Sequence, residues 1–226
     1  MNPKFTLVLA AVAGFADTAT FLKIGGLFSA HVTGNFVLLA LALDRGWGRQ
    51  EAVKVIAFAV FACGAIVTTA LYDTLLARAD ASAQKRWLLS VEGTLLLVAA
   101  VIPLAGGPGF VALCGLIAVL CMSIQNVFHR VVPHAPMPST VMTLNFTQSM
   151  IDLTRRALRP GHAAAATADA PKPRFFTPSW YAVGGFMTGC VFSSLAVHHL
   201  GLVALVFPSI ALFACALLMG AAPAEA

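Results

Sequence analysis

Charged residues are scarce in this sequence: Asp, Glu, Lys and Arg together make up 10% of its 226 residues. Soluble domains carry about 25% of such residues and about 45–50% apolar ones. Here 59% of the residues are hydrophobic, and the mean hydropathy is +0.88. So little charge cannot cover the surface of a water-soluble domain of this size. The composition therefore predicts a protein that lies in a lipid bilayer.

Alternation of apolar and polar residues is also missing. The apolar runs, such as Val55–Tyr72 and Leu202–Gly220, are continuous, whereas the strands of transmembrane barrels alternate. Backbone groups in lipid must find their partners inside the spanning structure, and the helix is the solution that fits continuous runs. We predict an all-α, polytopic membrane protein whose single membrane domain covers residues 1–226, with the lipid bilayer as its partner.

Signatures of catalysis, metal binding and nucleic-acid binding are lacking as well. The sequence has no GxSxG, no HExxH and no phosphate-binding loop. Its five cysteines fall within apolar runs and show no CxxC spacing. The net charge of +5 comes mostly from short basic connections, which are typical of the cytoplasmic loops of membrane proteins. We expect no enzyme, no cofactor, no metal and no nucleic-acid partner.

Eight apolar segments can be drawn along the chain, and a spanning helix needs about 17–25 residues. The second segment is interrupted by Gly25, Gly26 and Gly34, and the sixth is short and polar. Both are expected to be broken or tilted, which gives six to eight transmembrane segments. The eight are Phe5–Leu22, Ile24–Leu43, Val53–Leu76, Trp87–Ala105, Gly109–Phe128, Ser139–Leu153, Trp180–Leu200 and Leu202–Ala222.

The sequence contains a faint internal repeat. Residues 32–36 read Val-Thr-Gly-Asn-Phe and residues 142–146 read Met-Thr-Leu-Asn-Phe. They favour a two-fold repeat of residues 1–105 and 109–222, either parallel or inverted, as in many transporters. A chance echo between apolar sequences is the alternative. The basic, proline-rich stretch 155–178 is predicted to be a flexible loop in the second repeat.

Polar residues inside the first two segments suggest a site. An unpaired carboxylate at Asp17 would cost about 2.5–3.5 kcal/mol in mid-bilayer, so this side chain should face the bundle interior or a watery cavity. The alternative is that Asp17 reaches the interface or caps the following turn. Around Thr33, Gly34 and Asn35 we predict a helix start whose free amides could bind an anion, with His31 as a titratable neighbour. An ordinary short helix near the surface is the competing interpretation.

A second polar group lies in the fifth and sixth segments. Gln125 and Asn126 form an adjacent amide pair, and the sixth segment places Asn145 and Ser149 on one helical face beside a row of threonines that includes Thr143. Such a helix lines a hydrated cavity or lies in the membrane interface. The alternative is that the amide side chains form interhelical hydrogen bonds, which contribute about 0.6 kcal/mol each.

Two further sets of residues are assigned structural roles. Glu92 follows a Lys-Arg-Trp interface anchor by about one to two turns, so we expect it to lie at shallow depth with a local partner. Small residues allow membrane helices to approach closely. On this basis helix contacts are predicted at Gly64, Gly184, Gly185 and Gly189.

These polar residues carry a family resemblance that extends over essentially the whole chain. Gly14-Phe-Ala-Asp17-Thr18-Ala-Thr-Phe21, followed by Gly26-Leu-Phe-Ser-Ala-His-Val-Thr-Gly-Asn35, resembles the signature of the bacterial YoaK-like membrane proteins. Ser123-Ile-Gln-Asn126 and Thr140-Val-Met-Thr-Leu-Asn145 are similar to its second pair of motifs, with Ser123 and Leu144 where the family usually has Gly. The resemblance implies a protein of unknown function in the bacterial inner membrane.

The leading hypothesis is a transporter or channel-like protein for an unidentified small solute, with one polar site built from both halves. The rival is an accessory or assembly protein whose polar residues only hold helices together. Homo-oligomerisation is left open by the sequence. The residues expected at the site are Asp17, Thr18, His31, Thr33, Gly34, Asn35, Gln125, Asn126, Thr143, Asn145 and Ser149.

Overall fold

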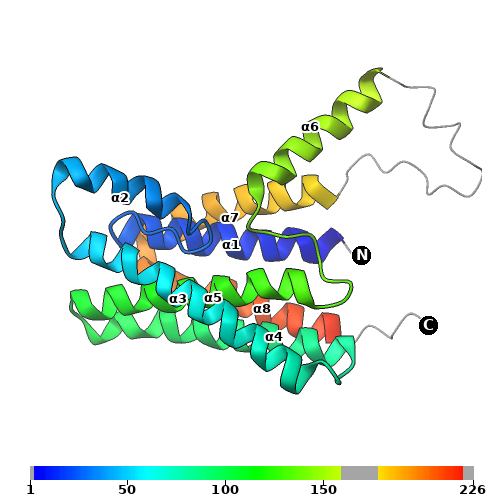
Figure 1. Ribbon diagram of the computed structural model, residues 1–226, viewed down its shortest axis with the longest axis horizontal. Coiled ribbons are helices and arrows are strands. Elements are labelled where there is room, and N and C mark those ends of the chain that lie inside the picture. The colour runs from blue at the N-terminus through cyan, green and yellow to red at the C-terminus, as the bar shows by residue number, and fades with distance from the viewer. Residues whose placement is uncertain (1–2, 159–177, 221–226) are drawn as a thin grey trace, which may run out of the picture.

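The computed structural model describes residues 3–158 and 178–220, and no strand occurs among them, which confirms the all-α prediction. Short 3-10 or π turns join some of the helices (Figure 1). In chain order the elements are α1 (Pro3–Lys23), α2 (Gly34–Arg45), α3 (Arg49–Leu71), η1 (Tyr72–Leu76), α4 (Ala81–Val101), η2 (Ile102–Ala105), α5 (Pro108–Val131), α6 (Met142–Leu158), α7 (Pro178–Leu200), η4 (Gly201–Leu205) and α8 (Val206–Gly220).

Within the described residues, five stretches are long and apolar enough to cross a membrane. The last of them, 41 residues from Pro178 to Leu218, contains both α7 and α8. Gly201, at a positive φ of 61°, begins the turn between these two helices, and Figure 1 shows them running in opposite directions. The described chain therefore crosses six times, at the lower end of the predicted range, and the protein is a multi-pass membrane protein.

The two segments expected to be irregular are indeed so. Residues 24–33 form no helix, and the 12 residues of α2 are too short to span a bilayer. The sixth segment forms α6, an amphipathic helix that points away from the bundle in Figure 1. It extends to Leu158, so the predicted loop begins later than residue 155, and residues 159–177 lie outside the described residues.

The two halves of the chain contain the same order of elements in opposite directions. Figure 1 shows α1 running away from the end that holds both termini, whereas α5 runs toward that end. The helices of the two halves pack against each other: α1 packs on α7, α3 packs on α5, and α4 packs on α8. This arrangement has the form of an inverted repeat. That the halves arose by duplication stays a prediction.

Close contact between α1 and α7 depends on glycine. A Cβ atom built on Gly185 would lie 2.2 Å from the carbonyl oxygen of Leu7, and one on Gly189 would lie 2.1 Å from that of Ala11. Gly64 plays the same part between α3 and α5, where a Cβ would lie 2.2 Å from the Ser123 hydroxyl. These three predictions of packing glycines are confirmed.

Gly184 is the exception among the glycines predicted at helix contacts. A Cβ atom built on it would meet nothing within 4 Å, because the residue faces away from α1. The prediction for Gly184 was therefore wrong, since adjacent glycines in a helix point in different directions.

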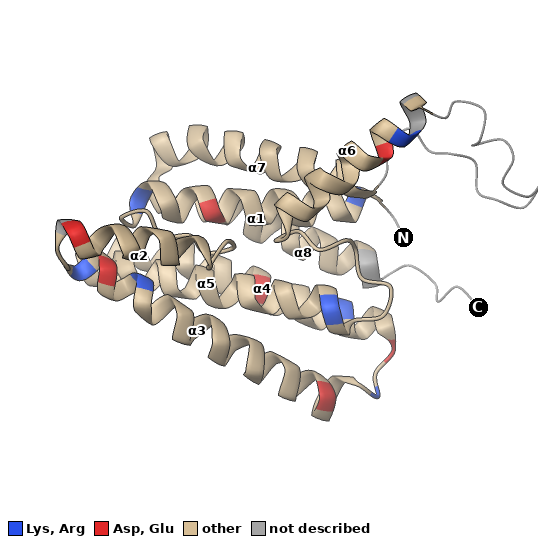
Figure 2. Ribbon diagram, turned by 45° about the horizontal axis from the view of Figure 1, so that its top comes forward, with Lys and Arg blue, Asp and Glu red and all other residues tan. Residues whose placement is uncertain are grey.

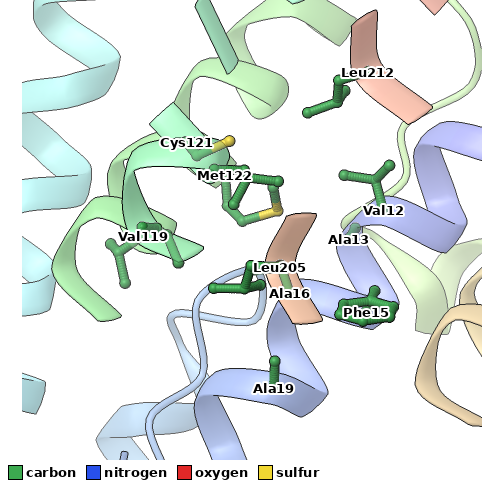
Figure 3. Packing of buried hydrophobic residues seen from close by; sticks show 14 of the residues in the cluster. Val12, Ala13, Phe15, Ala16, Ala19, Val119, Cys121, Met122, Leu205 and Leu212 are labelled. Atoms are coloured by element: carbon green, nitrogen blue, oxygen red, sulfur yellow. The ribbon is translucent and has the colours of Figure 1, made fainter. Parts of the chain in front are cut away.

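The core lies where α1, α5 and the η4–α8 segment meet. Figure 3 shows Val12 and Ala16 of α1 near Met122 of α5 and Leu205 of η4, all of them buried. Charged residues are arranged differently. Figure 2 shows most of the Lys and Arg residues near the ends of the helices, as expected for segments that cross a bilayer.

The glycine contacts give a matched pair of variants. Gly189→Ala should lower the free energy of unfolding by about 1–3 kcal/mol, the usual range for overpacking, because its new methyl group would meet the α1 backbone. Gly184→Ala, five positions earlier on the same helix, should lose no stability. Thermal unfolding of both variants in detergent tests the difference. Equal melting temperatures would contradict the close α1–α7 packing.

Candidate functional site

Asp17 holds the non-helical segment 24–33 against α1. Its Oδ1 atom accepts hydrogen bonds from the backbone N–H groups of Ala30, at 2.8 Å, and His31, at 3.4 Å. The Nδ1 atom of His31 lies 2.8 Å from the other carboxylate oxygen. The Asp17 side chain is 5% exposed and that of His31 is 32% exposed, so the imidazole is the accessible member of the pair. The expectation that Asp17 faces the bundle interior with a partner is met.

Asn35 fixes the same segment from the other side. Its side-chain oxygen accepts from the backbone N–H of Phe28 at 2.9 Å, and its side-chain nitrogen donates to the Phe28 carbonyl at 2.9 Å. Phe28 lies outside any helix, and the fully buried Asn35 amide supplies hydrogen-bond partners for both its backbone N–H and its backbone C=O. Gly34 packs against the Phe28 ring, where a Cβ would come within 3.0 Å.

The start of α2 differs from the open anion site that the sequence suggested. The helix begins at Gly34, as predicted, but Thr33 is exposed and its side chain makes no capping hydrogen bond. The N–H groups of Gly34, Asn35 and Phe36 already donate to carbonyls three residues earlier. Because these amides are paired within the turn, the first turn of α2 does not present them to a ligand.

A second polar cluster lies at the end of α5. The Gln125 side chain donates to the Leu9 carbonyl of α1, at 2.9 Å, and to the Ser139 hydroxyl. His129 bridges Ser139 and the Pro136 carbonyl, each at 2.9 Å. A carbonyl can only accept, so Nδ1 of His129 donates to it, and Nε2 of the neutral ring accepts from the serine. The chain of hydrogen bonds fastens residues 132–141 to α5.

Asn145 repeats the role of Asn35. It donates to the carbonyl of Pro138, seven residues earlier, at 2.8 Å, just as Asn35 donates to a carbonyl seven residues earlier. Asn126 accepts from the Thr140 hydroxyl at 2.8 Å, and those two residues are 14 apart, as are Asp17 and His31. In each half, then, an interrupted segment is held by the preceding helix and by the Asn that follows it.

The predicted residues form two clusters rather than one shared site. The loop cluster of the first half comprises Asp17, His31, Gly34 and Asn35, and that of the second comprises Gln125, Asn126 and Asn145. Leu9, which contacts the second cluster, precedes Asp17 by eight residues, or about 12 Å of helix.

The remaining predicted residues lie around these clusters. Thr18 faces Cys190 of α7. Ser149 is buried, and its hydroxyl donates to the Asn145 carbonyl at 2.9 Å. Thr33 and Thr143 are both exposed. Within the clusters, the Ser29 hydroxyl and the Gln125 side-chain oxygen are buried and have no hydrogen-bond partner among the described residues.

The sequence analysis missed the positions of two polar residues, Ser139 and Glu92. The spacing of 14 residues between Asp17 and His31 recurs between Gln125 and Ser139 and could have identified Ser139. Glu92 was placed wrongly: it is fully buried, and neither of its carboxylate oxygens has a partner among the described residues. It is the twelfth of the 21 residues of α4, too deep for the shallow position expected.

The two loop clusters predict an order of stabilities. Asn35→Ala removes both partners of Phe28, whereas Asn145→Ala removes the donor to one carbonyl, and each buried polar group left unpaired costs about 1–3 kcal/mol. Thr33→Ala and Thr143→Ala, two residues earlier in each half, should have little effect because both side chains are exposed. Melting temperatures in detergent should fall most for Asn35→Ala. A larger loss for either threonine variant would contradict the assignment.

Comparison with known proteins identifies the group to which this sequence is related. The chain is 28% identical over 155 residues to the "UPF0700 transmembrane protein YoaK" of Bacillus subtilis (strain 168). That match covers 66% of this chain and 66% of the relative, so it spans just under two thirds of that protein. No solved structure matches the chain. The family description "Protein of unknown function (DUF1275)" matches residues 5–218, and the chain therefore belongs to this family, as the YoaK-like motifs indicated.

Proposed function

We propose that this protein is a transporter for a small polar solute, located in the plasma membrane of a bacterium. The observation that carries the proposal is the inverted arrangement of two interrupted helical segments. Each segment is hydrogen-bonded to the long helix that precedes it. In each, the side chain of an Asn also donates to a backbone carbonyl seven residues earlier. Transporters use interrupted segments of this kind as binding sites and rock inverted halves against each other to expose them alternately.

The polar atoms available to a solute support this proposal. His31 is the more accessible member of its pair with Asp17, and the Ser29 hydroxyl close to it in sequence has no partner in the described part of the protein. In the second cluster the side-chain oxygen of Gln125 is likewise unpaired. Both atoms are buried, so a polar solute could pair with either of them only when the cluster around that atom opens. The cost of leaving buried polar groups unpaired then favours such binding.

The rival is an accessory membrane protein, and one observation favours it. Asn35 pairs with the backbone of Phe28, and one carboxylate oxygen of Asp17 accepts from the backbone N–H groups of Ala30 and His31, so most of their hydrogen bonds go to the backbone of residues 24–33. On that interpretation the clusters only hold an irregular segment in place. The two proposals differ in whether a solute binds, and in whether the charge of Asp17 matters once the fold is intact.

A stability screen against small polar solutes tests the proposal. A ligand at 100 times its Kd stabilises the folded state by about 2.7 kcal/mol, so a true solute should raise the melting temperature of the wild type. Asp17→Asn retains an acceptor for the Ala30 N–H but loses the charge beside His31, and should lose most of that rise.

The control is Asp44→Asn, at an exposed position near the end of α2, which should respond as the wild type does. The accessory role would be favoured if no solute stabilised the wild type while Asp17→Asn simply unfolded.

Basic residues point to an orientation in the membrane. The end of the bundle that holds both termini in Figure 1 is also where α1 and α4 begin and α5 and α6 end. Among the Lys and Arg side chains that the structure describes, it carries Lys4, Arg78, Lys85, Arg86, Arg130 and Arg155, whereas the opposite end carries Lys23, Arg49 and Lys54. Lys and Arg accumulate on the cytoplasmic side of membrane proteins. The start of α1 and the end of α8 are therefore assigned to the cytoplasmic side.

Cysteine labelling of intact cells checks this orientation. Trp47→Cys lies in the exposed α2–α3 connection and should react with a maleimide that cannot cross membranes. Ala77→Cys lies in the exposed turn at the other end and should react only after the cells are permeabilised. The reverse pattern of labelling would invert the assignment.

A further inference from the structure

Glu92 is a carboxyl group buried midway along the membrane-spanning helix α4, without a hydrogen-bond partner among the described residues. It lies halfway along α4 and is 0% exposed. Neither oxygen accepts or donates a hydrogen bond, and no Lys, Arg or His forms an ion pair with it in the part of the chain that the structure describes. The titratable groups that face it are thiols, Cys121 of α5 and Cys215 of α8.

The surroundings of Glu92 select a proton over a metal ion as its ligand. A bound Na⁺ or divalent cation needs several oxygen ligands around it. Among the described residues, no cluster of His, Cys, Asp and Glu could hold a metal, and the nearby Ser209 hydroxyl donates to the Gly93 carbonyl at 2.7 Å. A neutral carboxylic acid requires no such shell, because apolar surroundings favour the uncharged form.

Next to Glu92, a partly open pocket separates α4 from α3. This apolar pocket of about 480 Å³ lies between α3, α4 and α5. Leu88, Val91 and Leu95 of α4, all within one turn of Glu92, line it. The corresponding pocket of the other half, between α7, α8 and α1, has a volume of about 200 Å³. Glu92 itself does not line the wider pocket. A separation of α3 and α5 from α4 that extended this pocket to Glu92 would let water reach the carboxyl group.

We propose that Glu92 binds the proton that couples transport to the membrane proton gradient. In the closed bundle the carboxyl group is protonated. When the helices around it part, its O–H bond breaks, the proton passes to water, and a carboxylate remains until the bundle recloses and a proton is taken up. The coupling rests on the proposed transport function, whereas the binding and exchange of the proton can be measured without any solute.

Infrared spectroscopy of the purified wild type and Glu92→Gln tests this site with D₂O as the only probe. The wild-type-minus-variant spectrum at neutral pH should contain the carbonyl stretch of a protonated carboxylic acid. After transfer to D₂O this band should shift within minutes, faster than the amide groups of the core helices exchange. Gln is close to Glu in size, and thermal unfolding verifies that the variant is folded.

Each other outcome overturns the proposal. If the band is absent, Glu92 is ionised and binds no proton. If the band is present but does not shift while the core amides exchange, Glu92 is a permanently neutral structural residue. Glu51→Gln is the matched control, because Glu51 pairs with Lys54 at the start of α3 and should contribute no such band. If the Glu92 band shifts in D₂O but no solute raises the melting temperature, the proton site stands and the proposed class of transported solute is refuted.

Discussion

The structure depends on one requirement of lipid: every backbone N–H and C=O group inside the bilayer needs a partner within the protein. Helices meet this requirement by themselves, but residues 24–33 and 132–141 are not helical. Side chains replace the missing helix bonds there, as when Asn35 pairs with both backbone groups of Phe28 and Asn145 with the carbonyl of Pro138. The buried amides are therefore what allow these segments to leave the helix.

The interrupted segments also depend on how closely the long helices pack. Each segment lies on the helix that precedes it, and that helix is fixed by its partner from the other half, α7 for α1 and α3 for α5. Glycine brings the α7 backbone against Leu7 and Ala11, and Ser193 then donates to the Phe15 carbonyl at 2.8 Å. Because α1 is held along most of its length, Asp17 presents its carboxylate at a fixed place.

Composition and hydropathy were sufficient to predict the helical membrane fold, and the motif residues predicted where the helices are interrupted. A start at Gly34 follows from the Thr-Gly-Asn sequence, since such residues favour helix termini. Contacts between distant residues could not be predicted in this way. The bonds from Gln125 to Leu9, and the separation of the clusters, follow from the opposite directions of α1 and α5. Glu92 was misplaced because the nearby Lys-Arg-Trp sequence resembles an interface anchor. The helix begins four residues before that sequence, at Ala81, and Glu92 lies at the centre of α4.

Asp17 and Glu92 show two ways of keeping a carboxyl group in the bilayer. Asp17 accepts hydrogen bonds from two backbone N–H groups and pairs with an imidazole. Glu92 lies near the thiols of Cys121 and Cys215, and its carboxylate oxygens have no hydrogen-bond partner among the described residues. If Glu92 served only to fill space, a Leu or Met would do so without the cost of burying a polar group. In the proposed role the side chain acts in a state in which it meets water, and the pocket beside α4 is where such a state would begin.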